Sequence, residues 1–393
     1  MARVPKHDPD IKYPQTQSKL PDSGTSIFAE MSALAVEHQA INLSQGFPDY
    51  PMSDELIGLT WEAMKAGFNQ YAPMPGWPAL REAIAEKIQS LYQVAIDPAT
   101  EITITPGGTY AIYATIATLV HPGDEVIVLE PAYDCYIPAV QVHGGIPVRI
   151  PLKYPEYRVD WALVREKVSP RTRLILLNSP HNPTGSVLLP EDIAQLVSLV
   201  RETQILILSD EVYEHLIFDG LQHQAMLSHP ELFQRSISVF SFGKLYHNTG
   251  WKVGYCVGPQ PLMKEFRKIH QFLAFSTHTP SQVAFAQFLK KKEAYLFLPQ
   301  FFQQKRDEFR EMLKETRLDP LPCSGSYFQL VSYRRISQEP DKEFAIRLTR
   351  EFQVAAIPVS AFYQDHHDDQ VLRFCFAKKT ETLQQAVSRL ARL

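Results

Sequence analysis

The 393-residue chain has little cysteine and no long run of apolar or basic residues. Its four cysteines form no C-x-x-C pair, which argues against a disulfide framework or a zinc site and fits a reducing compartment. No apolar segment approaches the length of a transmembrane helix. The longest basic run is Lys290 to Lys292 and the formal net charge is -4, so we expect neither a nucleic-acid nor a membrane partner.

The N-terminal segment also lacks targeting features. It has no apolar core of the kind found in signal peptides, and Asp8 and Asp10 interrupt the acid-poor composition of a transit peptide. We therefore expect a cytoplasmic protein. Residues 1–25 carry four prolines among polar residues, which predicts an arm without regular structure.

The rest of the chain has the composition of a globular protein, with 45% hydrophobic and 21% charged residues, and its length suggests two domains. From about residue 100, short β-branched runs alternate with longer helical stretches, which predicts an α/β domain with a mostly parallel sheet. The expected strands are continuous apolar runs at 102–105, 125–129, 174–177, 205–208 and 237–240, with 253–257 as a further candidate.

Helical patterns separate and follow these strands. The clearest predicts a helix over 190–203, where apolar residues recur three or four apart after Pro190 and Glu191. Residues 261–317 are predicted to be mainly helical. Residues 318–393 mix short strands and helices, which suggests a second, smaller domain.

Polar and glycine residues gather where the expected strands end, which is where open α/β sheets bind their ligands. Thr105 to Thr109 form a glycine-rich turn before a helical stretch, and such a turn can present free N–H groups to a phosphate. A plain strand-to-helix turn is the alternative. The chain has neither G-x-G-x-x-G after a strand nor G-x-x-x-x-G-K-[ST], so a small phosphorylated cofactor fits better than a dinucleotide or a nucleoside triphosphate.

Asp210 emerges from the apolar run 205–208, and a buried carboxylate needs a cationic partner. A protonated ring nitrogen would serve, and a structural arginine would serve equally well. The segment Asn178 to Gly185 follows another strand and is rich in Pro, Asn and Gly, which indicates a tightly shaped turn.

Lys244 closes the apolar strand at 237–240. If it is partly buried, desolvation lowers its pKa and lets the amine condense with a carbonyl as a Schiff base, whereas a solvated surface lysine would do nothing. Arg373 stands between apolar residues on a candidate strand, where it is either a bidentate carboxylate clamp or part of a core ion pair.

Residues 366–369 combine two histidines and two aspartates, which are residue types that can bind metals. His366 and His367 precede Asp368 and Asp369, but consecutive side chains rarely converge on one ion, so we predict a solvated loop and no metal.

Together the strand-end motifs resemble one family, the fold type I, pyridoxal-phosphate-dependent aminotransferases of class I, particularly their kynurenine, glutamine and methionine aminotransferase-like branch. The likeness runs from about residue 25 to the end of the chain. It rests on eight motifs in the family's order: Asn42–Asp49, Asn69–Tyr71, Gly107–Thr109, Ser179–Gly185, Ser209–Tyr213, Ser241–Lys244, Gly325–Phe328 and Arg373–Phe376.

The resemblance implies a large domain with a mostly parallel seven-stranded sheet flanked by helices, and a smaller α+β domain. On this basis we divide the chain into an N-terminal arm (1–25), an N-terminal part of the small domain with an active-site segment (26–50), a large cofactor-binding domain (51–290) and a C-terminal small domain (291–393).

The resemblance also implies roles for the residues that contact the ring of pyridoxal 5'-phosphate. Lys244 would carry the cofactor as a Schiff base and, once released, act as the base that moves the substrate Cα proton. Asp210 would keep the pyridine nitrogen protonated. Tyr213 and Asn182 would hydrogen-bond the phenolic oxygen, and Tyr133 would stack on the ring face.

The resemblance implies a second set of residues, which would bind the phosphate of the cofactor. Tyr71 would reach it from a partner subunit, which implies a homodimer with a shared active site. Lys252 stands where many members of the family have arginine, so its contact would be a point charge instead of a fork. The full set implied for the phosphate within one subunit is Gly107, Gly108, Thr109, Ser241 and Lys252.

For the substrates, an amino acid and a 2-oxo acid, the resemblance implies that Arg373 binds the α-carboxylate, with Asn182 and the backbone near Gly46 on the other side. Aspartate-specific relatives add a second arginine, and the comparable segment 275–280 offers none, which favours a neutral substrate. Phe28, Tyr71 and Tyr327 suit methionine or an aromatic amino acid.

Two other functions stay open from the sequence. A pyridoxal-phosphate-dependent β-lyase that cleaves the carbon–sulfur bond of cysteine conjugates would begin with the same proton abstraction by Lys244. A cofactor-binding sensor without turnover would need an appended helix-turn-helix domain, and the arm at 1–25 is too short to hold one.

Overall fold

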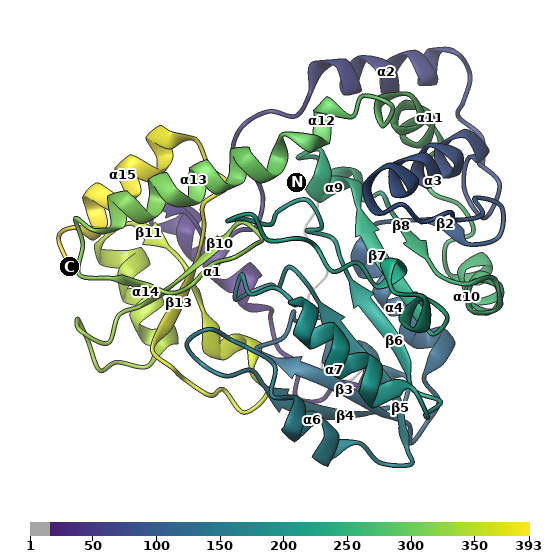
Figure 1. Ribbon diagram of the computed structural model, residues 1–393. Coiled ribbons are helices and arrows are strands. Elements are labelled where there is room, and N and C mark those ends of the chain that lie inside the picture. The colour runs from purple at the N-terminus through teal and green to yellow at the C-terminus, as the bar shows by residue number, and fades with distance from the viewer. Residues whose placement is uncertain (1–15) are drawn as a thin grey trace, which may run out of the picture.

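The computed structural model describes residues 16–393, and its largest element is a seven-stranded sheet (Figure 1). Within these residues the structure contains no helix with both the length and the apolar character needed to cross a membrane. In spatial order, the strands of the sheet are β2 (Ile102–Thr105), β8 (Gly254–Val257), β7 (Ser236–Ser241), β6 (Leu206–Asp210), β5 (Thr172–Asn178), β3 (Glu125–Glu130) and β4 (Ile146–Pro151).

All neighbouring pairs are parallel except those of β8, which runs antiparallel to both β2 and β7. The carboxyl ends of β2, β3, β5, β6 and β7 therefore meet at one edge of the sheet, where β8 begins. Thr105 and Ser241 are both paired with Gly254 at this edge, and Asn178 is paired with Asp210. This geometry brings the predicted strand-end residues together.

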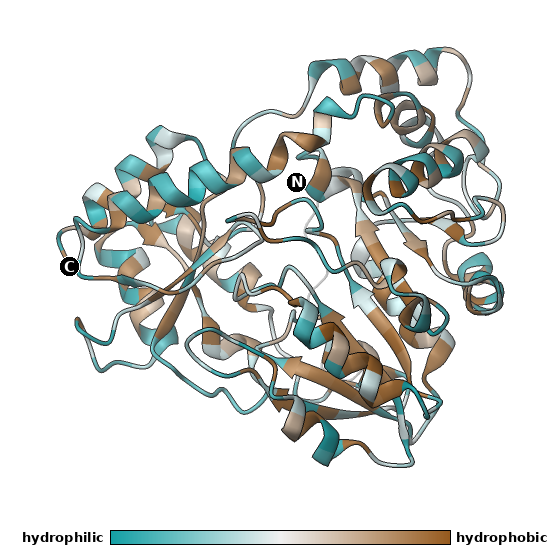
Figure 2. Ribbon diagram, viewed as in Figure 1, coloured by the Kyte–Doolittle hydropathy of each residue, from teal (hydrophilic) through white to brown (hydrophobic). Residues whose placement is uncertain are grey.

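The central strands are buried on both faces, which explains their continuous apolar sequences (Figure 2). On one face Ile127, Ile175 and Ile207 pack in a cluster with residues of α6 (Trp161–Lys167) and α7 (Pro190–Val200). On the other face Val128, Leu176 and Leu208 pack with residues of α4 (Gly108–Leu119), α5 (Tyr136–Val142) and α10 (Gln260–Leu273). Each aliphatic side chain buried in this way contributes about 1.5–3 kcal/mol.

The C-terminal part contains two smaller sheets. The first has the order β12 (Ile357–Pro358), β13 (Val371–Cys375), β10 (Phe328–Ser332) and β9 (Asp319–Pro320), with antiparallel pairing. In the second, β1 (Ile41–Asn42) pairs in parallel with β11 (Val354–Ala355), so the segment after the arm joins the C-terminal part. The helices around these sheets are α1 (Ile27–Glu37), α13 (Leu298–Leu313), α14 (Asp341–Glu351) and α15 (Thr380–Leu390).

The predicted fold class is confirmed, with the seven-stranded sheet and a separate smaller antiparallel sheet. The expected strands all occur, including β8 within 253–257, and the helix predicted over 190–203 is α7, which ends at Val200. β4 was not predicted. Its sequence contains two prolines and its side chains are mostly exposed or half-exposed at the edge of the sheet, so no continuous apolar run marks it.

Outside the sheets, the region 261–317 is helical as expected, with α10, α11 (Thr279–Phe288), α12 (Glu293–Leu296) and α13. Of the predicted arm, residues 16–25 contain neither helix nor strand, and residues 1–15 lie outside the described part. The domain boundaries stay a prediction. The remaining helical elements are α2 (Asp54–Lys65), α3 (Pro78–Tyr92), α8 (Pro230–Phe233), α9 (Phe242–Leu245) and the 3-10 turns η1 (Met226–Ser228), η2 (Thr249–Trp251) and η3 (Val359–Phe362).

Candidate active site

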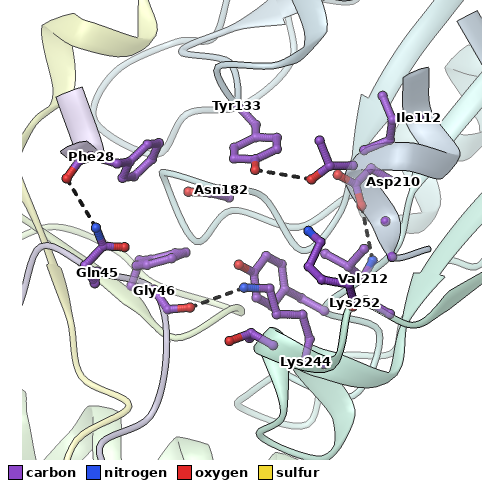
Figure 3. Close-up of a pocket in the computed structure, with 18 of the residues that line it drawn as sticks. Phe28, Gln45, Gly46, Ile112, Tyr133, Asn182, Asp210, Val212, Lys244 and Lys252 are labelled. Carbon is purple, nitrogen blue, oxygen red and sulfur yellow. Dashed lines mark hydrogen bonds between the residues drawn. The ribbon is translucent and has the colours of Figure 1, made fainter. Parts of the chain in front are cut away.

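A cavity of about 330 Å³ lies at the carboxyl edge of the large sheet, between that sheet and the segments around Phe28, Gly46 and Arg373 (Figure 3). The cavity gathers every residue predicted to contact the cofactor or the substrate carboxylate, except Tyr71. These lining residues are Gly46, Gly107, Gly108, Thr109, Tyr133, Asn182, Asp210, Tyr213, Ser241, Lys244, Lys252 and Arg373.

Lys244 lies in α9, the single turn of helix directly after β7, and its side chain faces the cavity. Its Nζ donates hydrogen bonds to the Gly46 carbonyl oxygen at 3.2 Å and to the Tyr327 hydroxyl at 2.7 Å. The burial of the amine disfavours its charged form and lowers the pKa of Lys244 to about 8. Lys244 is therefore not a solvated surface lysine, and a useful fraction of its amine is neutral near physiological pH.

Asp210 ends β6, and its carboxyl group is almost fully buried, with 4% of the residue exposed. Its Oδ2 accepts a hydrogen bond from the Tyr136 hydroxyl at 2.6 Å, and its Oδ1 accepts one from the Val212 N–H at 3.3 Å. Burial is the main cause that raises the pKa of Asp210 to about 6. Both of these donors are neutral groups, so the arginine considered from the sequence does not hold this carboxyl group within the described residues.

The glycine-rich turn after β2 forms one end of the cavity. Gly107 has a φ of +86°, which favours glycine, and it precedes α4. The first N–H groups of α4, at Gly108 and Thr109, have no partner within the helix and carry its positive end. Lys252 packs against Gly107, since a Cβ on that glycine would lie 3.5 Å from the Lys252 Cε. Backbone donors and one ammonium group are a donor set that suits a phosphate.

Arg373 on β13 is 1% exposed and is not part of a core ion pair within the described residues. Its Nη1 donates to Asn182 Oδ1 at 2.7 Å, its Nη2 donates to the Ser44 carbonyl oxygen at 2.9 Å, and its Nε finds no acceptor there. Burial lowers the pKa of Arg373 to about 10, which leaves the group charged at neutral pH. Three rings surround the guanidinium, with centroids 3.9 Å (Phe328), 5.2 Å (Phe28) and 5.2 Å (Phe362) from Cζ.

The turn that carries Asn182 is fixed to the sheet by Asn178. The Asn178 side chain donates to the Asp210 carbonyl oxygen at 2.8 Å and accepts from the Asn182 N–H at 2.8 Å. The Tyr133 hydroxyl, which also lines the cavity, lies 3.5 Å from the Thr109 Oγ1 (Figure 3). The amide of Asn182 and the ring of Tyr133 thus have fixed positions on the cavity wall.

Tyr71 is the predicted site residue that lies elsewhere. It is 81% exposed, does not line the cavity, and packs edge-on against Phe275 with ring centroids 5.5 Å apart. Its expected role was to act across a subunit boundary, and that role stays a prediction.

Two tyrosines contact the carboxyl group of Asp210 and the amine of Lys244, and neither contact was predicted from the sequence. Tyr136 holds Asp210, and Tyr327, expected only as part of the substrate pocket, contacts Lys244 instead. These pairs are 74 and 83 residues apart in the chain, so no local motif indicates them. The described residues contain no group of three or more His, Cys, Asp or Glu side chains arranged to hold a metal ion.

The sequence matches the family described as aminotransferase class I and II over residues 38–390. This match covers most of the chain, and the protein belongs to this family. It is an aminotransferase, which acts on an amino acid and an oxo acid, and members of its family are typically dependent on pyridoxal phosphate.

Individual relatives agree with the family. The chain is 50% identical to a methionine aminotransferase of Escherichia coli over 378 residues, which span 96% of this chain and 98% of the relative. It is 33% identical to a human kynurenine–oxoglutarate transaminase over 398 residues, with 92% and 94% coverage. A crystal structure of an E. coli protein with methionine aminotransferase function superposes with a TM-score of 0.94 at 49% identity, covering 97% of this chain and 100% of that chain.

Proposed function

We propose that this protein uses pyridoxal 5'-phosphate to transfer the amino group of a neutral L-amino acid, with methionine or an aromatic amino acid first, to a 2-oxo acid. The observation that carries the proposal is the convergence of Lys244, Asp210, the phosphate-suited turn at Gly107 and the buried Arg373 on one cavity. These groups supply an amine, a buried anion, phosphate donors and a carboxylate clamp.

The cavity fits pyridoxal phosphate by its donor set. When bound, the cofactor supplies an aldehyde that exchanges the amino group and a ring that accepts electrons. The N–H groups of Gly108 and Thr109, the Ser241 hydroxyl and the Lys252 ammonium would hold the phosphate, since all four residues line the cavity and Lys252 and Ser241 lie beside Gly107 and Gly108. Asp210 would hold the ring nitrogen, and that cation would relieve the cost of burying its carboxylate.

Lys244 would act as the base. Its pKa of about 8 leaves the amine able to accept a proton from the substrate Cα and then to release a proton to the cofactor carbon that takes up the amino group. Tyr213 lies beside it, with the Lys244 Nζ 5.5 Å from the Tyr213 ring centroid, and Asn182 faces the same cavity. We assign Tyr213 and Asn182 to the cofactor's phenolic oxygen and Tyr133 to the ring face.

Arg373 would bind the α-carboxylate of either substrate, beside Asn182 and the backbone of Gly46. Each Nη carries a second hydrogen beyond the one that it already donates. The guanidinium can therefore donate to a substrate carboxylate without breaking its present hydrogen bonds. Phe28 lines the same cavity and gives it an apolar wall, which favours a neutral side chain. The 50% identity to a methionine aminotransferase puts methionine first.

We also propose a homodimer with a shared site. Tyr71 and Phe275 form an exposed aromatic pair, 81% and 45% exposed, of the kind that a second copy would cover. A cytoplasmic location fits the four cysteines, all of which are unpaired.

The decisive experiment mixes the purified protein, loaded with pyridoxal phosphate, with methionine and with a panel of neutral and acidic amino acids. Conversion of the cofactor to its amine form with methionine, and its reversal by a 2-oxo acid, is the expected result. Failure to form the amine form with every amino acid would contradict the proposal. Release of pyruvate and a thiol from a cysteine conjugate, without the amine form, would instead identify a β-lyase.

A further inference from the structure

The hydroxyl of Tyr327 directly contacts the reactive amine. Tyr327 lies just before β10, is 1% exposed, and its hydroxyl oxygen accepts a hydrogen bond from the Lys244 Nζ at 2.7 Å. The same hydroxyl donates a short hydrogen bond to the Gly46 carbonyl oxygen. Since the Tyr327 proton is used on Gly46, the lone pairs of its oxygen are free for the amine.

Two acceptors therefore face the amine of Lys244, namely Tyr327 Oη and the Gly46 carbonyl oxygen. A neutral amine has two N–H donors and one lone pair, and these acceptors occupy both donors. The lone pair then takes the remaining direction of the tetrahedron, away from Tyr327 and Gly46. That direction is where a proton can be gained or lost without breaking either hydrogen bond.

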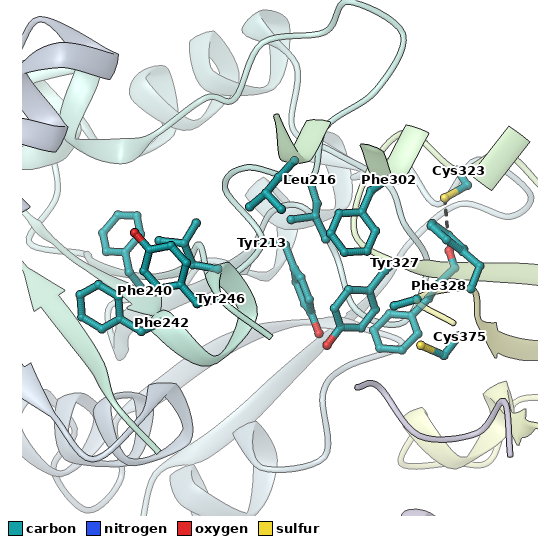
Figure 4. Close-up of a cluster of buried hydrophobic side chains, with 14 of the residues drawn as sticks. Tyr213, Leu216, Phe240, Phe242, Tyr246, Phe302, Cys323, Tyr327, Phe328 and Cys375 are labelled. Atoms are coloured by element: carbon teal, nitrogen blue, oxygen red, sulfur yellow. Dashed lines mark hydrogen bonds between the residues drawn. The ribbon is translucent and has the colours of Figure 1, made fainter. Parts of the chain in front are cut away.

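The protein holds this arrangement rigidly. The ring of Tyr327 packs edge-on against Tyr213 and Phe328, with centroids 5.1 Å and 4.9 Å away, so the hydroxyl has little freedom (Figure 4). Gly46 must be glycine for its carbonyl to come this close, because a Cβ there would lie 2.7 Å from the Phe328 Cζ.

We propose that Tyr327, together with the Gly46 carbonyl, is the positioning residue that orients the amine of Lys244 for its two proton transfers. The inference rests on the proposed function, in which Lys244 takes a proton from the substrate Cα. In the first transfer the lone pair of Nζ accepts that proton and the amine becomes an ammonium group. In the second, the ammonium group would release a proton to the cofactor carbon that carries the transferred nitrogen, which restores the neutral amine, and neither Tyr327 nor Gly46 gains or loses a proton.

The test is Tyr327→Phe, which removes one oxygen atom and keeps the ring. A matched control is Tyr157→Phe, because the Tyr157 hydroxyl is also buried, has no partner within the described residues, and lies in a separate core cluster. We expect the rate constant of the half-reaction with methionine to fall about tenfold in the loaded Tyr327 variant, as for the loss of one hydrogen bond to the reacting amine. The deuterium isotope effect with Cα-deuterated methionine should rise, while KM, cofactor affinity and melting temperature stay near those of the control.

A rate constant and an isotope effect equal to those of the control would overturn the proposal. Losses in cofactor affinity and thermal stability as large as the loss in rate would also overturn it, since they would show that Tyr327 has only a structural role. If the variant does not fold, 3-fluorotyrosine at position 327 keeps the ring and hydroxyl but weakens the oxygen as an acceptor, and it should slow the same step by a smaller factor. An unchanged rate with fluorotyrosine would equally refute the role.

A second readout needs no turnover. In the cofactor-free protein, the pH dependence of reductive methylation of Lys244, followed by mass spectrometry of its peptide, gives a midpoint that we expect at about pH 8. In Tyr327→Phe this midpoint should fall, because the ammonium form loses an acceptor. An unchanged midpoint would contradict the proposal, whereas a lack of amino-acid conversion by the unmodified protein would refute the proposed function itself.

Discussion

Replacing Arg373 with lysine tests whether the guanidinium recognises the substrate carboxylate. The planar guanidinium of Arg373 is held in place by hydrogen bonds of 2.7 Å to Asn182 and 2.9 Å to Ser44. Phe328 stacks on it, with its ring centroid 3.9 Å from Cζ. Lysine keeps the charge but loses one arm of the fork, worth about 1.5–3 kcal/mol, and part of the ring contact, worth about 0.5–2 kcal/mol. A total near 3 kcal/mol corresponds to about a 100-fold loss in kcat/KM.

The assay compares methionine with its carboxamide, which keeps the side chain and the amino group but has no carboxylate. The wild-type protein should prefer methionine strongly, and Arg373→Lys should reduce that preference about 100-fold, mostly by slowing methionine. The matched control is Arg334→Lys, since Arg334 also stacks on a ring, that of Tyr154 at 4.8 Å, but lies outside the cavity. An Arg373→Lys enzyme that keeps the wild-type preference for methionine over the amide would refute the reasoning.

Three further outcomes follow from the site and the core. Lys252→Met should weaken pyridoxal phosphate binding about tenfold or more while Lys252→Arg retains it, measured by equilibrium dialysis; equal affinities would remove Lys252 from the phosphate site. Because burial raises the pKa of Asp210 to about 6, its carboxylate is charged above that pH, so cofactor affinity should fall as the pH drops through about 6. This pH dependence of cofactor affinity should be absent in Asp210→Asn, and an identical pH profile in the two proteins would contradict the role of Asp210. Lys87→Met leaves Glu214 buried without its cation and should cost about 3 kcal/mol of unfolding free energy in urea, whereas Lys268→Met at an exposed pair should cost less than about 1 kcal/mol; equal costs would be evidence against the buried pair.

The strands that could be predicted from the sequence are those marked by a run of neighbouring apolar residues. β5 and β6 each contain a continuous apolar run, at 174–177 and 206–208, because helices cover both faces of the sheet, and such runs are visible without coordinates. β4 escaped prediction because its position at the sheet edge leaves its residues partly exposed. The two-residue strands β11 and β12 are too short to produce any pattern.

For the site, the sequence located the groups but not all of their contacts. Asp210 and Lys244 were predicted because each follows an apolar strand, and parallel strands bring such ends together. Their partners Tyr136 and Tyr327 could not be predicted, since each contact depends on how distant segments pack. The choice between a clamp and an ion pair for Arg373 likewise needed the positions of its neighbours.

The central claim is that Lys244, and not its neighbour Lys252, carries the cofactor. The direct measurement is to load the protein with pyridoxal phosphate, reduce it with borohydride and locate the added mass by peptide mass spectrometry. We predict that the modification lies on Lys244 and is lost in Lys244→Ala, with the fold retained. A modification on Lys252, or a protein that carries none, would contradict the account.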